Sequence, residues 1–217
     1  MKNLFTKLSV CLLMASSLFL TSCSTNSDEA VVIVEKATVP ELLSNANKLE
    51  TTWTIKRYVF NRSNGANGLG HVGVGLEIRS ANPTAVYFYG GGVENEKGSF
   101  AILPGSNNFG WAYSFASNAA LLSYVKNTKG YNRYKFESSF KTITYQRVVN
   151  TINELNYLPN RGYLLAGNNC MNAVYDVLNQ GGGLFIPAPT ASAALYAPNT
   201  WYGSLINQIG WSNSANL

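Results

Sequence analysis

The stretch from His71 to Arg79 alternates strictly between large apolar residues and a second set of small or polar residues. Successive side chains of a strand point to opposite faces, so the two sets would lie on opposite sides of a sheet. A polar segment at residues 80–84 separates this stretch from a second apolar one, Ala85–Tyr89. Together they predict an antiparallel hairpin. The apolar set is Val72, Val74, Leu76 and Ile78, and the second set is His71, Gly73, Gly75 and Glu77.

The rest of the chain contains further helical and strand patterns, without an internal repeat or a break in composition. Residues 40–217 are therefore expected to form one α+β domain in which an antiparallel sheet packs against helices. Gly90–Gly92 and Gly181–Gly183 are interpreted as turns or close backbone approaches. Residue patterns predict helices at 40–49, 118–126, 144–155, 170–178 and 201–209, and strands at 53–60, 71–79, 85–89, 98–103, 111–115, 134–137 and 162–166.

The N-terminus has the features of a secretory signal. Lys2 and Lys7 give it a positive start, and its apolar run at residues 8–20 is shorter than the roughly 20 residues that a membrane-spanning helix needs. Leu20-Thr21-Ser22-Cys23 resembles the lipobox of bacterial lipoproteins, which are cut before the cysteine and carry lipid on its sulfur. We therefore expect removal of residues 1–22, lipid on Cys23 and a tether at residues 23–39. An ordinary secretory signal is the alternative.

The lipobox resemblance implies a bacterial cell envelope, with the protein anchored to a membrane through Cys23. No aspartate follows Cys23, and the resemblance then implies the outer membrane rather than the inner one. It leaves open whether the domain faces the periplasm or the exterior.

Processing would leave a single free thiol. Cys11 would leave with the signal and Cys23 would be consumed by lipid, so Cys170 would remain without a disulfide partner. The chain also has one histidine, His71. Any mechanism that needs a thiol and an imidazole must therefore use this pair.

Composition excludes several function classes. The chain has 16 basic and 11 acidic residues without a Lys/Arg block, so we expect no nucleic-acid partner. One histidine and one available thiol cannot supply the usual three or four metal ligands, and no phosphate-binding glycine loop is present. We therefore expect no metal and no cofactor, and we expect a monomer.

The residues around Cys170 are typical of a reactive thiol. Asn169 precedes a helical pattern and is a favourable N-cap, which would place Cys170 in the first turn of the helix. Free N–H groups there stabilise a thiolate, and the N–H groups of Cys170 and Asn169 could hold an oxyanion. His71 would then move the proton, with space for a substrate or a helix beside Gly73 and Gly75. The alternatives are that Cys170 is a small apolar residue of the core and that His71 has a structural role only.

Several of these pieces together resemble a known family. They are Gly70-His71-Val72-Gly73-Val74-Gly75, the helix at 144–155, the strand at 163–166 and Asn169-Cys170. In this order they resemble the circularly permuted branch of the NlpC/P60 papain-like superfamily, to which lecithin–retinol acyltransferase-like proteins belong. The resemblance covers roughly residues 53–178. It implies a papain-like α+β fold, a nucleophilic Cys170, a basic His71 and, in exported bacterial members, cleavage of an amide in the peptidoglycan stem peptide.

Two departures from the family bear on the chemistry. Acyltransferase relatives carry Asn-Cys-Glu-His, whereas Met171-Asn172 follows Cys170 here. An amidase or endopeptidase is therefore preferred over a thiol acyltransferase or a lipid or ester hydrolase. Relatives also often orient the first histidine with a second one, which this chain lacks.

Hairpin register suggests which group replaces that second histidine. If Ile78 pairs with Val86, Asn95 lies beside His71, and Asn95 becomes the third catalytic residue. A slip of one residue would place Glu94 there instead. Tyr89 is a further candidate and would also line the cleft.

A function without catalysis is the main alternative. A papain-like groove can lose its chemistry and keep its shape, as in a surface lipoprotein that binds a glycan or a protein. The 13 tyrosines and four tryptophans could supply stacking surfaces for such a ligand.

Overall fold

The computed structural model describes residues 35–38, 40, 52–81, 84–94, 101–102, 110–164, 168–182, 186–189 and 197–217. All of them belong to one structural unit, Val32–Leu217. Several expected features lie outside the described residues: the signal, the lipidation site at Cys23, the helix after Pro40, most of the strand at 98–103 and the candidate residue Asn95.

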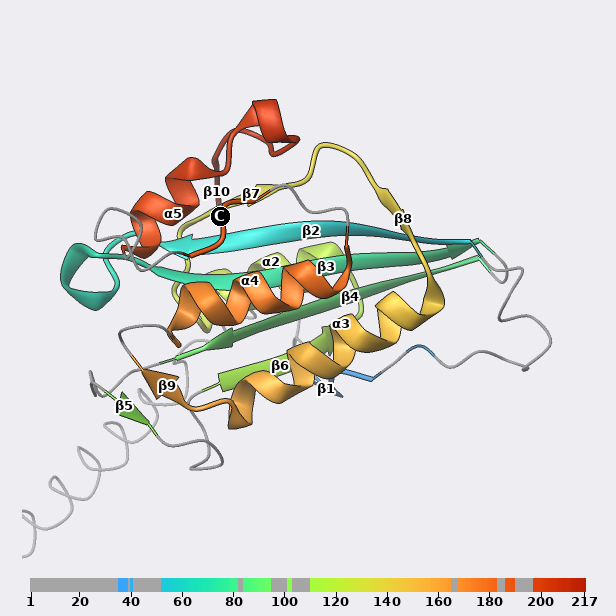
Figure 1. The fold of residues 1–217 in the computed structure, drawn as a ribbon, viewed down its shortest axis with the longest axis horizontal. Coiled ribbons are helices and arrows are strands. Elements are labelled where there is room, and N and C mark those ends of the chain that lie inside the picture. The colour runs from blue at the N-terminus through green and yellow to red at the C-terminus, as the bar shows by residue number, and fades with distance from the viewer. Residues whose placement is uncertain are drawn as a thin grey trace, which may run out of the picture. The chain divides into compact units, whose positions relative to one another are not determined.

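An eight-stranded antiparallel sheet forms the centre of the fold (Figure 1). Its strand order is β1-β6-β4-β3-β2-β7-β10, and β8 pairs with β2 next to β7. A second, two-stranded sheet joins β5 (Ala101–Ile102) to β9 (Tyr163–Leu164). The α+β class and the antiparallel sheet are thus confirmed. The bounds are β1 Glu35–Lys36, β2 Trp53–Arg62, β3 His71–Ala81, β4 Thr84–Val93, β6 Gly110–Phe115, β7 Arg133–Phe136, β8 Lys141–Ile143 and β10 Ala215–Asn216.

Helices cover both faces of the sheet (Figure 1). Helices α3 (Tyr145–Tyr157) and α4 (Cys170–Gln180) pack on one face, and α2 (Asn118–Asn127) packs on the other. In the described part of the chain, short 3-10 helices connect the elements: η2 (Ala66–Gly68), η3 (Leu158–Asn160) and η5 (Asn207–Ile209). Among the described residues, no helix is both long and apolar enough to cross a membrane.

The last helix begins earlier than the sequence predicted. Helix α5 spans Pro198–Ser204, and η5 is a separate 3-10 turn, whereas one helix was expected from Trp201 to Ile209. Pro198 occupies the first turn, where its fixed φ and missing N–H cost nothing. Pro198 therefore marks the start of the helix, whereas the apolar spacing after it wrongly predicted a start at Trp201.

The two faces of β3 have different cores. Val72, Val74, Leu76 and Ile78 are fully buried in the cluster that includes α3 and α4 residues. On the opposite face, the aromatic rings of β2 and β6 pack with α2 around the small residues of β3 and β4. This second cluster contains Tyr58, Phe60, Trp111, Phe115, Leu121, Val125 and Tyr131.

Glycines on the His71 side of β3 make room for aromatic rings and not for a substrate. A Cβ added to Gly73 would lie 2.6 Å from the Tyr131 hydroxyl, and one added to Gly75 would lie 2.7 Å from Cζ of Phe60. Gly90–Gly92 also lie inside strand β4. A Cβ on Gly91 would lie 2.4 Å from Leu155 Cδ1, so this triplet is a close approach and not a turn.

A buried ion pair links the sheet to the end of α4. Arg57 of β2 donates from Nε and Nη2 to the Glu137 carboxylate, at 2.8 Å each. Its Nη1 donates to the carbonyls of Leu178 and Gly182 at 2.9 Å. Burial of a charged group is costly unless its hydrogen-bond donors find acceptors, and these four bonds offset that cost for the Arg57 guanidinium.

Candidate active site

His71 is the first residue of β3 and lies opposite Arg62 in the register of β2. The residue before it, Gly70, has φ +93°, in the left-handed region that favours glycine. A Cβ on Gly70 would also lie 2.4 Å from Asn199 Oδ1. Asn199 donates from Nδ2 to the carbonyls of Ser63 and Gly68, so α5 holds the loop that leads into His71.

Glu94 lies beside the imidazole. Ile78 pairs with Tyr87 and not with Val86, so the hairpin register differs by one residue from the one that favoured Asn95. Continued past β4, the observed register brings Glu94 opposite His71. The Glu94 Oε2 atom is 3.3 Å from His71 Nε2, in a charge contact without the alignment of a conventional hydrogen bond.

Three other side chains hold the Glu94 carboxylate. Trp111 Nε1 donates to Oε1 at 3.0 Å and the Tyr131 hydroxyl donates to it at 3.4 Å, while Arg62 Nη2 lies 3.5 Å from Oε2. Burial would raise the pKa of Glu94, but the interactions with His71 and Arg62 outweigh it and lower the pKa to about 2. Glu94 is therefore a buried carboxylate that stays charged at neutral pH.

Cys170 is the first residue of α4, as predicted, and is 3% exposed. Asn169 caps the helix: its Oδ1 accepts from the N–H groups of Met171 and Asn172. The Asn169 N–H donates in turn to Asn172 Oδ1 at 3.2 Å. This N–H therefore belongs to a capping box, and the oxyanion role expected for Asn169 is replaced by a helix-capping role.

Replacement of Asn169 by alanine removes this cap and should destabilise the protein. The expected loss in free energy of unfolding is about 1 kcal/mol, within the roughly 0.5–2 kcal/mol measured for such caps. Urea denaturation of the two proteins would measure it. Asn179→Ala in the same helix is the control, because it removes an exposed amide of the same size that caps no helix. A loss at position 169 no larger than that at position 179 would contradict the capping role.

The thiol and the imidazole meet at this end of the sheet. The Cys170 side chain lies close enough to His71 to act on the pKa of its imidazole, although the two residues are 99 positions apart (170 − 71). Burial would lower the pKa of His71, but the charge and hydrogen bond of Cys170, followed by those of Glu94, raise it to about 10. The Tyr131 ring stacks on the imidazole with centroids 5.8 Å apart. A thiol, an imidazole and a carboxylate are thus gathered at this end of the sheet.

The structure brings together some of the predicted residues and not others. Cys170 and His71 meet, and Glu94, the alternative under a one-residue slip, takes the third place. Tyr89 lies opposite Leu76, and its hydroxyl donates to the Thr38 carbonyl, so it neither orients His71 nor lines a cleft beside it.

The sequence did not indicate that Arg62, Trp111 and Tyr131 contact Glu94 at this site. A signal for Tyr131 was present in the glycines on the His71 face, because Gly73 and Gly92 both approach the Tyr131 hydroxyl. Glycines on a strand indicate a bulky neighbour but do not identify it.

A charge-neutralising substitution at Glu94 tests the triad through pH. Glu94→Gln should lower the pKa of His71 from about 10, because the carboxylate that stabilises the imidazolium is lost. His71 is the only histidine of the chain, so its NMR titration in untagged protein is unambiguous. An unchanged His71 pKa in the variant would contradict the contact.

The same variant should lose stability in a defined pH window. The contact between His71 and Glu94 contributes its full stability to the fold where, even in the unfolded chain, Glu94 is ionised and His71 is protonated. This window lies between about pH 4.5 and 6.5. The stability difference from the wild type should shrink as pH rises towards 10, where His71 loses its proton. It should also shrink as pH falls towards 2, where Glu94 gains one.

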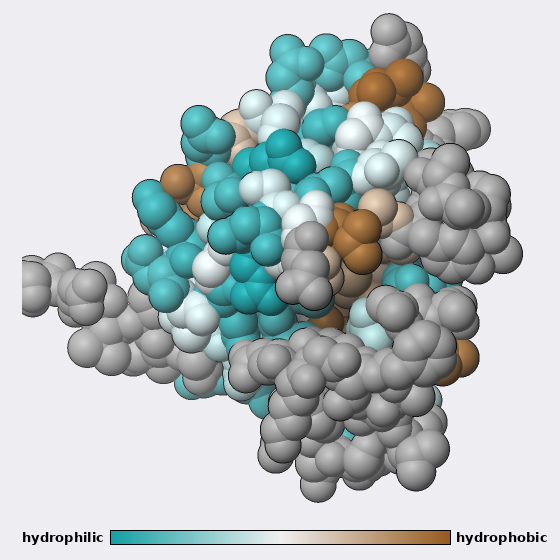
Figure 2. All heavy atoms as spheres, turned by 90° about the vertical axis from the view of Figure 1, so that its left-hand side faces the viewer, coloured by the Kyte–Doolittle hydropathy of each residue, from teal (hydrophilic) through white to brown (hydrophobic). Residues whose placement is uncertain are grey.

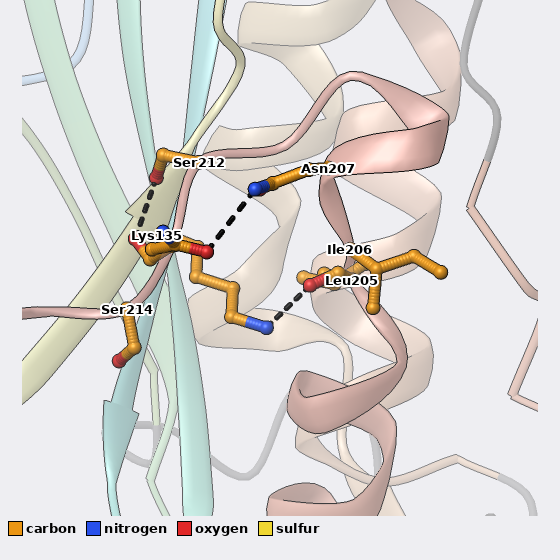
Figure 3. A pocket seen from close by; sticks show the side chains of 7 residues that line it. Lys135, Leu205, Ile206, Asn207, Ser212 and Ser214 are labelled. Carbon is orange, nitrogen blue, oxygen red and sulfur yellow. Dashed lines mark hydrogen bonds between the residues drawn. The ribbon is translucent and has the colours of Figure 1, made fainter.

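A separate cavity of about 370 Å³ lies among β7 and the C-terminal segment (Figure 3). Lys135 lines it, but the ammonium group donates to the carbonyls of Tyr202, Gly203 and Leu205 at the end of α5. Asn207 likewise donates to Asn213. The cavity's polar groups thus bond within the protein.

The end of the molecule where β2 ends and α4 begins is largely hydrophilic on the visible part of its surface (Figure 2).

The chain was compared with models of known protein families, with curated proteins and with solved structures, and no match was found in any of the three comparisons.

Proposed function

We propose that this protein is a cell-envelope cysteine hydrolase of the permuted NlpC/P60 type, an amidase or endopeptidase that acts on peptidoglycan stem peptides. The observation that carries the proposal is the meeting of Cys170, at the start of a capped helix, with His71 and Glu94. An antiparallel sheet with the cysteine helix packed on one face supports the papain-like assignment.

The roles follow from the atoms that each residue presents. Nε2 of His71 is next to Glu94, which leaves Nδ1 for the Cys170 thiol. Transfer of the thiol proton to His71 gives a thiolate–imidazolium pair, and Glu94 stabilises the positive ring. The positive end of α4 favours the thiolate, and the Cys170 N–H is the oxyanion donor in this proposal.

The reaction has two steps. The thiolate attacks the amide carbonyl and forms a C–S bond; the C–N bond then breaks as His71 gives its proton to the leaving amine. His71, now neutral, accepts a proton from a water molecule that attacks the thioester, so that a C–O bond forms and the C–S bond breaks. A free carboxylic acid leaves, and the thiolate–imidazolium pair is restored.

Anchoring through lipid on Cys23, after removal of residues 1–22, is part of the proposal. It would hold a single domain, from residue 40 onward, close to the outer membrane and to the cell wall. Two or three acyl chains on one cysteine hold a protein firmly, because each buried CH₂ contributes about 0.8 kcal/mol.

A non-catalytic binding module is the second candidate, and the burial of Cys170 favours it. A thiol that is 3% exposed also suits a core residue that no substrate reaches. In that case the protein would bind a glycan or a protein and would leave it intact.

Incubation of the purified protein with peptidoglycan and with isolated muropeptides separates the two candidates. The hydrolase should cleave stem peptides into two fragments that together gain one water, and mass spectrometry detects these fragments by their new carboxyl and amino ends. Retention of peptidoglycan by the protein in a pull-down, without any cleaved peptide, would support the binding module and contradict the hydrolase.

A further inference from the structure

One charged side chain connects the segment before Cys170 to both helices on that face of the sheet. Arg161 follows η3, and its side chain is 13% exposed. Nε donates to Asn168 Oδ1 at 2.7 Å, Nη1 lies 3.3 Å from Glu154 of α3, and Nη2 lies 2.5 Å from Asp176 of α4. A planar guanidinium can satisfy three acceptors at once in a fixed geometry, which an ammonium group cannot.

The contact with Asn168 is close to the thiol in the chain. Asn168 and Leu164 exchange backbone hydrogen bonds of 3.1 and 2.9 Å, so Asn168 is fixed against strand β9. The next residue is the N-cap Asn169, and Cys170 follows it. The capping box fixes how α4 begins, but only contacts to other elements fix where it begins relative to His71.

We propose that Arg161 is a positioning residue for Cys170: the arms of its fork to Asn168 and Glu154 hold the start of α4 at the distance from His71 that the thiol–imidazole contact requires, whereas the arm to Asp176 is exposed and dispensable. This inference rests on the proposed function. Its physical basis is that attack geometry and proton sharing are both steep functions of distance, so that a shift of about 1 Å can cost on the order of 100-fold in rate.

The experiment compares the arms of the fork by the rate of Cys170 alkylation with iodoacetamide, measured from pH 5 to 10. Arg161→Gln removes all three contacts, and Asn168→Ala removes only the arm that reaches the segment before Cys170. Asp176→Ala is the matched control, since its carboxylate side chain is 41% exposed and it leaves the Arg161–Asn168 bond in place. Circular dichroism and urea denaturation identify conditions in which every variant is folded.

Arg161→Gln and Asn168→Ala should lower the alkylation rate at pH 6 by roughly 10- to 100-fold. Their pH–rate profiles should also differ from that of the wild type, because the contact between Cys170 and His71 is weakened. Asp176→Ala should stay within about twofold of the wild type. A role in stability alone would reduce the free energy of unfolding and leave these profiles unchanged.

The outcomes separate this inference from the proposed function. A fast wild type with equally fast, folded Arg161→Gln and Asn168→Ala variants would overturn the positioning role and leave the hydrolase intact. Wild-type Cys170 that reacts no faster than glutathione would overturn both.

Discussion

Alanine in place of Cys170 is expected to abolish the hydrolysis of stem peptides, and alanine in place of His71 should lower it by roughly 10²- to 10⁴-fold. The first change removes the atom that forms the thioester. The second leaves the thiol but removes the group that takes its proton and returns it to the leaving amine. The measurement is the rate of peptide cleavage by the two purified variants against that of the wild type.

Conservative variants at the same positions control for folding. Cys170→Ser keeps the size of the side chain, and His71→Gln keeps a polar side chain at the start of β3. Both should remain folded by circular dichroism and should still lack activity; Cys170→Ser should unfold in urea close to the wild type, and His71→Gln should lose only the stability that the contact with Glu94 provides. Cleavage at the wild-type rate by either alanine variant would exclude the proposed mechanism.

Among the proposed substitutions, Glu137→Ala should cause the largest loss of stability, about 3–5 kcal/mol in the free energy of unfolding. It leaves the Arg57 guanidinium, which is fully buried, without its carboxylate. Urea denaturation, followed by tryptophan fluorescence or circular dichroism, would measure the loss.

An exposed ion pair provides the control for this change. Asp176→Ala also removes a carboxylate from an arginine, but its side chain is 41% exposed, so the expected loss is about 1 kcal/mol or less. The double variant Arg57→Met, Glu137→Leu should recover part of the stability, because no charge is then buried alone. It should not recover all of it, because the carbonyls of Leu178 and Gly182 lose their donor. Equal losses from Glu137→Ala and Asp176→Ala would contradict this account.

Local sequence patterns were enough to predict the position of Cys170 in the fold. Its place in the first turn of α4 and the capping role of Asn169 follow from residue type and order alone, because both concern neighbours in the chain. Alternation in β3 likewise predicted its two faces, and the structure confirms the burial of Val72 to Ile78 on the α4 side.

Longer-range features could not be predicted with the same certainty. The choice between Asn95 and Glu94 depended on the hairpin register, which the turn sets. A slip of one residue moves every side chain to the opposite face of the sheet. Tyr131 and Arg62 come to Glu94 from other parts of the chain, and nothing in their own neighbourhoods indicates that contact. The meeting of Cys170 with His71 was suggested by family resemblance, and no local pattern alone predicts it.

Within the described residues, the outermost strands of the large sheet, β1 and β10, have two residues each. A neighbouring molecule that tried to extend the sheet would find room for few main-chain hydrogen bonds at either border. Short edge strands of this kind are a known protection against edge-to-edge pairing of sheets, which leads to aggregation. At the high local concentration that the proposed lipid anchor would create, this protection would let many copies of the domain lie side by side without aggregating.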